Sequence, residues 1–584
     1  MNTTLFKEIS YSLSKIIEDI DMGEIGLPEL QRPFVWPNTK VRDLFDSMHK
    51  GFPVGYLLFW ENGVGENHRQ IGLDPKQKYP RLLIVDGQQR LTSLFAVLKG
   101  INVLRDNYRS EHISIAFRPK DNKFEVADAA IRRDPEFIPD ISVLWSKNLN
   151  HNRFNKEFFK KLRDSRDVSD DEEDQLTEVI GHLCDIGNYP FTALELSSNV
   201  SEEDVAEVFV RVNSKGTILN QADFILTLLS VFWDQGRAEL EEFCRLSRIP
   251  ASSHASPFNY YIHPDPDQLL RVNVGLGFRR ARLKNVYSIL RGKDLETEEY
   301  SVTKRDEQFA IFKSAQVNVL DLQNWHEFLK TIQQAGYISQ GMISSQNSLL
   351  YAYTFFLIGK RDYGVDHFKL RNTIARWFFM TALTSRYSAS FETIMEQDLA
   401  RLRDVKNASQ FVSMINHIIN DTVTEDYWTI TLPNELATSS PRSPSLFAFY
   451  AALCLQKANI LFSELPVSVL LDPAIKAKKA AAERHHLFPK GYLETIGMTE
   501  IRDTNQIANF ALVEWDDNIG ISDDPPSVYF PKYASRFSKH ELTQMLSWHG
   551  LPQGWENMEY KQFLEQRRKL IAQEIRAGFS KIKE

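Results

Sequence analysis

The chain has little cysteine, no long apolar run and no excess of positive charge. Its 584 residues include only three cysteines, which lie far apart and form no CxxC pair, at positions Cys184, Cys244 and Cys454. This scarcity argues against a disulfide framework and against a cysteine-ligated zinc site. No run of about 18 apolar residues occurs, so we expect no membrane span. The first residues lack a signal-peptide core, which favours a cytoplasmic protein.

The charge balance limits how the chain can contact nucleic acid. It has 69 Lys and Arg residues against 77 Asp and Glu residues, so the formal net charge is −8. A protein that binds nucleic acid over its whole surface is usually basic, so any DNA contact must come from local patches. The length exceeds what one hydrophobic core normally supports and predicts roughly two to four domains.

The order of apolar runs, turns and helix-like stretches predicts an α+β fold that is predominantly helical. Residues 1–230 mix strands and helices, residues 231–435 are mostly helical, and residues 436–584 form a third domain. A stretch rich in Pro, Ser and Thr, residues 431–445, is the best linker candidate. The acidic run at residues 164–174 is expected to be a solvated, mobile loop.

Two adjacent histidines and two later asparagines have a spacing that suggests chemistry. His485 and His486 begin the motif HHLFP, and Asn509 is followed nine residues later by Asn518. Hydrolysis of a phosphodiester needs a base for water and a cation for the developing charge. Neutral imidazole is a suitable base near pH 7, and His and Asn can both ligate a divalent cation. The alternative is a strand capped by structural histidines, with unrelated asparagines in turns.

This combination, with Pro489 after the histidines, resembles the HNH nuclease superfamily and, within it, the HxxP-type nuclease domain of the GmrSD restriction family. The resemblance implies a ββα-metal domain in which His485 and Asn518 bind the cation, His486 is the general base and Asn509 ties the hairpin together. Many HNH enzymes have Asp in place of His485, so the metal expected, magnesium or manganese, is open. Nearby basic residues are candidate contacts to DNA phosphates: Lys476, Lys478, Lys479, Arg484 and Lys490.

A second motif lies in the N-terminal region. The apolar run at residues 82–85 predicts a buried strand that leads through the sequence DGQQR into a helix. Free N–H groups at a helix start, together with Arg90, can hold a phosphate. Asp86 is suited to a metal or a ribose hydroxyl, and Gln88 and Gln89 to a water or a base edge. A tight turn with a surface arginine is the alternative.

The DGQQR box, the segment LPELQRPFVW at residues 27–36 and RVNSKG at residues 211–216 together resemble the N-terminal domain of the GmrSD family, which is related to ParB and sulfiredoxin. The resemblance implies binding and hydrolysis of GTP, ATP or CTP. It assigns these residues to the nucleotide or its surroundings: Asp86, Gly87, Gln88, Gln89, Arg90, Gln31, Arg32, Arg211 and Asn213. A salt bridge and a helix-end turn are the alternative for the last two. Phe34 and Trp36 are expected in the core.

The resemblance as a whole implies an anti-phage, modification-dependent DNA endonuclease or nickase that is regulated by a nucleotide. Some members sense phosphorothioate in host DNA, and others attack glucosylated or methylated phage cytosines. A homodimer is also considered. Two alternatives stay open: a nucleotide-switched DNA-binding defence protein that does not cut, and an HNH toxin that cuts RNA. The segment 384–388 also resembles the family, with Arg386 at a packed helix end, in a bridge between domains or on a phosphate.

Overall fold

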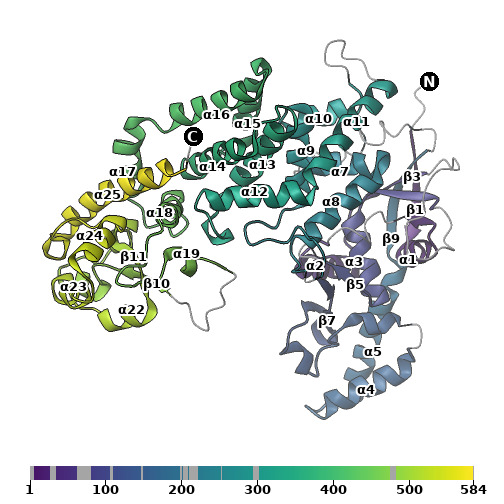
Figure 1. Cartoon of the computed structure of the whole chain (residues 1–584). Helices are drawn as coiled ribbons and strands as arrows, with labels where there is room; N and C mark the ends of the chain where they lie inside the picture. Colours follow the sequence, from purple (N-terminus) through teal and green to yellow (C-terminus); the bar gives the residue numbers. More distant parts are fainter. Residues whose placement is uncertain are drawn as a thin grey trace. The chain divides into compact units, whose positions relative to one another are not determined.

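A computed structural model gives the fold (Figure 1). It describes residues 5–26, 34–61, 80–105, 109–146, 149–197, 200, 208, 221–251, 253–293, 301–473 and 482–582. The chain forms two compact units, residues 1–220 and residues 221–584. The further division of the second unit at residue 435 stays a prediction. Helices outnumber strands in the described ranges, so the predominantly helical α+β class is confirmed.

The N-terminal unit is built on a five-stranded sheet with the order β1-β9-β3-β4-β2. The sheet is mixed, because its central strand β3 runs antiparallel to β4 and parallel to β9. The strands of this sheet are β1 (Phe6–Ser12), β2 (Ile25–Gly26), β3 (Leu57–Glu61), β4 (Leu82–Asp86) and β9 (Pro190–Leu196). Two hairpins add β5 (Asn102–Leu104), β6 (Ser110–His112), β7 (Ile115–Arg118) and β8 (Lys123–Val126).

The predicted strand, turn and helix around the DGQQR box are confirmed. Strand β4 ends at Asp86, Gly87 adopts a φ of 97°, and α3 (Gln88–Lys99) begins at the next residue. The residues from Leu91 to Leu98 are all buried, which places α3 in the core of the unit. A positive φ suits glycine, and a Cβ on Gly87 would also lie 2.4 Å from the Leu57 side chain.

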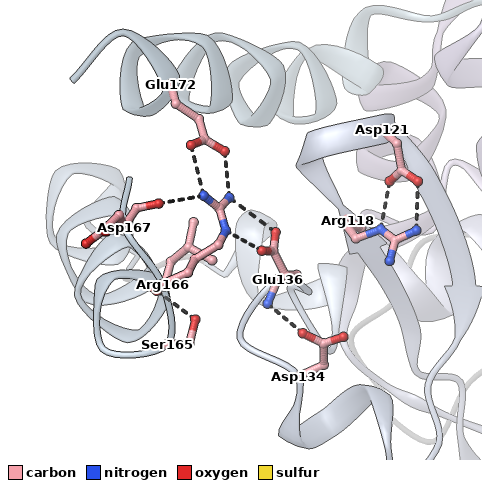
Figure 2. Close-up of polar contacts among 9 residues, drawn as sticks. Arg118, Asp121, Asp134, Glu136, Ser165, Arg166, Asp167 and Glu172 are labelled. Carbon is pink, nitrogen blue, oxygen red and sulfur yellow. Dashed lines mark hydrogen bonds and ion pairs between the residues drawn. The ribbon is translucent and has the colours of Figure 1, made fainter. Parts of the chain in front are cut away.

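The expectation of a mobile acidic loop is wrong. Helix α4 (His151–Arg163) ends just before the run, and α5 (Asp170–Cys184) begins inside it. Four acidic residues lie in the first turn of α5, where the helix dipole favours negative charge. Figure 2 shows Arg166 between Glu136 and Glu172, with its guanidinium bonded to both carboxylates. The hydrogen bond from Arg166 lowers the pKa of the Glu172 carboxyl and fixes the segment between the helices.

The described part of the N-terminal unit also contains helices α1 (Leu13–Asp21) and α2 (Asn38–His49). In the C-terminal unit the predicted helical region is confirmed, with α7 (Gln221–Phe232), α8 (Asp234–Leu246), α9 (Pro266–Phe278), α10 (Leu283–Leu290), α11 (Val302–Val319), α12 (Leu322–Gln334), α13 (Gln346–Arg361), α14 (His367–Leu383), α15 (Phe391–Ala400) and α16 (Ala408–Thr422). Helices α13 and α14 are buried on nearly all sides, as expected for helices at the centre of a bundle.

The segment after α14 is a packed helix end. Arg386 makes two hydrogen bonds to the carboxylate of Asp398, at 2.9 and 2.7 Å. The Tyr387 hydroxyl donates to the same carboxylate at 2.7 Å. Asp398 is buried, so its charge is compensated by this arginine and this hydroxyl. Arg386 is therefore used inside the fold, as the packed helix end among the alternatives for this segment predicts.

The stretch expected to be a linker is partly helical and buried. It contains α17 (Leu432–Glu435) and leads into α18 (Pro444–Leu455), and Leu432 and Leu436 are fully buried. The chain continues through α19 (Val467–Leu470), β10 (Ala482–His486), α20 (Lys490–Thr495), α21 (Ile501–Thr504), β11 (Phe510–Glu514), α22 (Trp515–Ile521), α23 (Pro526–Ala534), α24 (Lys539–Trp548) and α25 (Tyr560–Ser580). Within the described ranges, no helix combines the length and hydropathy needed to cross a membrane.

Candidate active site

Two strands and a helix in the C-terminal unit bring the predicted residues together. Strand β10 pairs antiparallel with β11, so that His485 lies opposite Ala511 and His486 opposite Phe510. Helix α22 follows β11 directly and contacts both strands (Figure 1). His485, near the end of β10, is thereby placed next to Asn518 of α22, and His486 follows it in the chain. Residues separated by more than thirty positions in the sequence form one cluster.

His485 is held as a neutral imidazole. Only 3% of its surface is exposed, and burial lowers its pKa to about 4. The hydrogen bond to Asn518 opposes this shift, and the nearby His486 adds to it. The ring meets Tyr529 edge to face at 5.8 Å. Metal ions bind a deprotonated imidazole nitrogen, so neutral His485 can be a ligand once a cation replaces the Nδ1 proton that is donated to the amide oxygen of Asn518.

The pair formed by His485 and Asn518 fits two neighbouring ligands of a divalent cation. Nδ1 of His485 lies 2.8 Å from Oδ1 of Asn518. Two ligand atoms about 2.1 Å from an octahedral cation, at right angles to each other, are about 3.0 Å apart. Nε2 of His485 is buried and has no hydrogen-bond partner among the described residues. No group of three or more His, Cys, Asp or Glu side chains suited to a metal is found in the described ranges.

His486 is half-buried and has a different partner. Its Nε2 lies 2.9 Å from Oδ1 of Asn505, and its ring lies 4.5 Å from the ring of Phe510. An amide oxygen accepts and cannot donate, so Nε2 of a neutral ring carries the proton. The basic lone pair is then on Nδ1. Asn505 was missed by the sequence reasoning, and its polar side chain four residues before Asn509 was the available signal.

Asn509 joins the turn after β10 to the loop before β11. It is fully buried, and its Oδ1 accepts a hydrogen bond from the Phe488 N–H at 2.9 Å. Its Nδ2 donates to the carbonyl oxygens of Phe488, at 3.1 Å, and of Thr504, at 3.0 Å. These three bonds use both ends of the amide. They fix the chain on both sides of the cluster that contains His486.

The backbone around the cluster is braced by long side chains from other helices. Arg567 of α25 is fully buried and donates to the carbonyl oxygen of Ala508 at 2.7 Å. Burial lowers the pKa of Arg567 to about 9, so the guanidinium remains charged at pH 7. The Tyr529 hydroxyl donates to the Leu487 carbonyl at 2.6 Å. These contacts hold the segments before Asn509 and after His486 in place.

The candidate DNA contacts are only partly described. Lys490 is exposed at the first position of α20, directly after the turn that follows the histidines. Arg502 of α21 has 82% of its side chain exposed and is a further cation on the loop before β11. Lys476, Lys478 and Lys479 lie outside the described residues, and for Arg484 only the backbone is described. The basic patch therefore stays a prediction.

In the N-terminal unit, the Arg90 side chain contacts the backbone of the loop before β3. Its guanidinium donates to the carbonyl oxygens of Val54, at 2.6 Å, and Tyr56, at 2.8 Å. It also lies 3.4 Å from the Asp86 carboxylate, and burial lowers its pKa. A Cβ on Gly55 would lie 2.6 Å from the guanidinium, so the close approach depends on this glycine. Arg90 holds the loop before β3 against the start of α3.

The other residues of this box are placed around the same helix start. Oε1 of Gln89 accepts a hydrogen bond from the Val35 N–H at 3.2 Å. Gln88 is partly exposed at the first position of α3. Phe34 is buried and Trp36 packs against the core, so the core prediction for both is confirmed. The following predicted residues lie outside the described ranges: Gln31, Arg32, Arg211 and Asn213.

Comparison with known proteins finds similarity in both units of the chain. Residues 13–230 match the family described as the GmrSD restriction endonuclease, N-terminal domain. The N-terminal region is therefore similar to this domain of GmrSD-type restriction endonucleases. The chain is also similar to an uncharacterized protein of Methanocaldococcus jannaschii, with 23% identity over 570 residues, or 89% of this chain and 87% of that protein. This second similarity extends past the GmrSD-type region into the C-terminal unit.

Proposed function

We propose that this protein is a restriction endonuclease of the GmrSD type that cuts or nicks phage DNA at the cluster of His485, His486 and Asn518. The family match of the N-terminal region supports a phage-defence restriction nuclease. The observation that carries the assignment of the centre is the 2.8 Å approach of His485 Nδ1 to Asn518 Oδ1, beside a second histidine. The antiparallel pair β10–β11 followed by α22 is the element order of a ββα-metal nuclease.

In the proposed reaction His486 is the general base. Its Nδ1 takes a proton from the water that attacks the phosphorus and later releases this proton to solvent, while the leaving oxygen takes a proton from water as its bond to phosphorus breaks. His485 and Asn518 hold a divalent cation, magnesium or manganese. When bound, this cation supplies charge neutralisation for the pentacovalent phosphate and the leaving oxygen. Asn509 keeps both segments of the site rigid through its three hydrogen bonds.

A nucleoside triphosphate, GTP, ATP or CTP, is proposed to bind at the start of α3 and to regulate cutting. Backbone N–H groups in the first turn of an α-helix have no partner within the helix, so those at the start of α3 can bind a phosphate. Asp86, whose carboxylate also lies 3.4 Å from Arg90, and Gln88 are the side chains of the box proposed to contact the ligand, because Arg90 donates to the loop before β3 and Gln89 accepts from Val35. The proposed role of Arg90 is thus to position the site.

Cleavage of plasmid DNA by the purified chain tests this proposal. Wild type, His486→Ala and the control His540→Ala, an exposed histidine, are compared with Mg²⁺ or Mn²⁺ and with or without each nucleotide. The DNA is unmodified, phosphorothioated or glucosylated at hydroxymethylcytosine, and an RNA arm is included. We expect wild type and His540→Ala to cut and His486→Ala to lose at least about 100-fold.

The other outcomes point to the alternatives. Cutting of RNA but not DNA would favour the toxin. No cutting of any substrate, together with phage protection that survives His486→Ala, would favour a nucleotide-switched binding protein. Equal cutting by wild type and His486→Ala would contradict the proposed centre while leaving a nuclease elsewhere in the chain.

A further inference from the structure

A residue outside both sequence motifs contacts the proposed general base. Oδ1 of Asn505 lies 2.9 Å from Nε2 of His486, across nineteen positions of sequence. Asn505 ends helix α21 and comes four residues before Asn509. Nothing in the HHLFP motif or in the spacing from Asn509 to Asn518 involves this position. The contact therefore calls for its own explanation.

The loop that carries Asn505 is fixed on both sides. The Asn505 N–H donates to the Ile501 carbonyl at 2.9 Å, and the preceding residue, Thr504, accepts from Asn509 at 3.0 Å. Two residues later, the Ile507 N–H donates to the carbonyl oxygen of Thr438 at 2.9 Å. A side chain anchored through its backbone in this way loses little entropy when it binds a partner. It can hold a histidine ring in one orientation.

Contacts with Asn505 and Phe510 restrict the orientation of the His486 ring. The ring lies against Phe510 with centroids 4.5 Å apart, which limits its tilt. The Asn505 oxygen limits rotation, because a half turn of the ring would replace Nε2 with a carbon at this position. The oxygen also accepts only, so it stabilises the tautomer protonated on Nε2. A base that must use Nδ1 needs this tautomer.

We infer that Asn505 is a positioning residue that holds His486 in the tautomer with a proton on Nε2 and the basic lone pair on Nδ1. The inference rests on the proposed function, in which His486 takes the proton from water. The amide supplies a hydrogen-bond acceptor without adding a negative charge near the DNA phosphate. An aspartate would accept equally well but would repel the substrate.

Three variants separate positioning from folding. Asn505→Leu keeps the size and removes the acceptor, Asn505→Asp keeps the acceptor, and Asn557→Leu changes an exposed asparagine in the same unit as a control. On the DNA that wild type cuts, we expect Asn505→Leu to lower kcat about 10- to 100-fold with KM changed less than about threefold. Asn505→Asp should retain kcat within about tenfold, and Asn557→Leu should match wild type.

A spectroscopic measurement reads the tautomer without turnover. The full chain is labelled with ¹⁵N-histidine, and the signals of His486 are identified by their loss in His486→Ala. We expect wild type and Asn505→Asp to show protonated Nε2 at neutral pH and Asn505→Leu to show a mixture of tautomers. If Asn505→Leu does not fold, Asn505→Ala makes the same comparison.

Each remaining outcome contradicts the inference in a recognisable way. Wild-type kcat in Asn505→Leu, or an unchanged tautomer, would overturn it while the nuclease assignment stands. Equal loss in the Leu and Asp variants would overturn it as well, since keeping the acceptor would then make no difference. If wild type cuts nothing, the proposed function fails first, and the role of Asn505 in proton transfer fails with it.

Discussion

Asn509 and Phe488 are joined by two hydrogen bonds that use opposite ends of one amide. Oδ1 of Asn509 accepts from the Phe488 N–H at 2.9 Å, and Nδ2 donates to the Phe488 carbonyl at 3.1 Å. The Asn509 side chain thus bonds the Phe488 backbone as a neighbouring strand would, just after the end of β10. Since Asn509 is fully buried, water cannot replace either bond.

Asn509→Asp tests this relationship directly. The substitution replaces the Nδ2 donor with an oxygen that faces the carbonyl oxygens of Phe488 and Thr504. A buried carboxylate without these donors should destabilise the C-terminal unit by about 3–5 kcal/mol. Urea unfolding followed by tryptophan fluorescence measures the change, with the exposed Asn557→Asp as the control. A loss below about 1 kcal/mol would show that the bonds contribute little.

Arg90→Met tests whether the arginine of the DGQQR box is structural. The variant removes the donors to the carbonyl oxygens of Val54 and Tyr56 and leaves both without the guanidinium. We expect a loss of about 2–3 kcal/mol in the stability of the N-terminal unit. The neighbouring Gln88→Ala, at a partly exposed position, should change it by less than about 1 kcal/mol. Thermal unfolding of both variants gives the comparison, and equal melting temperatures would contradict the role of Arg90.

The buried His549 predicts an acid-sensitive C-terminal unit. Burial lowers its pKa from 6.5 to about 4, against the hydrogen bond with the Asn459 carbonyl, so the folded chain keeps this ring neutral. As pH falls below 6.5 the unfolded chain binds a proton that the folded chain does not. The contribution of His549 to stability is therefore lost between pH 6.5 and pH 4 and amounts to about 3 kcal/mol.

The matched variant for this prediction is His549→Gln, which keeps a donor and does not titrate. Urea unfolding at several pH values should show the wild type losing about 3 kcal/mol relative to the variant between pH 7 and pH 4. Above pH 7 the difference between the two proteins should be constant. A constant difference down to pH 4 would mean that His549 does not remain neutral in the fold.

His485→Asp tests the proposed cation site through its metal preference. An imidazole favours transition metals and a carboxylate favours magnesium. We expect wild type to be inactive after chelation and to recover more activity with Mn²⁺ than with Mg²⁺. The variant should shift the ratio of Mg²⁺- to Mn²⁺-supported cleavage upward by about tenfold. Asn518→Leu removes the second proposed ligand. After chelation, its cleavage activity should not recover with either ion.

The sequence predicted local secondary structure and the proximity of the motif residues. It did not predict which atoms side chains such as Arg90 and Asn505 contact. The apolar run before Asp86 and the buried face of α3 follow from periodicity alone. The acidic run was misjudged because four acidic residues suggest a solvated loop, whereas at a helix start they are stabilised by the dipole. The direction of Arg90 depends on carbonyls more than thirty residues earlier, which no local pattern encodes. Asn505 was missed for the same reason, since its partner is brought close only by the fold.

The hydrogen bond from the Ile507 N–H to the Thr438 carbonyl bears on where the chain can be divided into fragments. Thr438 lies in the stretch that composition marks as a linker, yet its carbonyl fixes the loop between Asn505 and Asn509. Helix α17, just before it, contacts α25, which carries the brace Arg567. A fragment cut at the apparent linker would lose this acceptor and uncover α25. The smallest autonomous fragment that contains the candidate site must therefore start upstream of Leu432, inside the helical region.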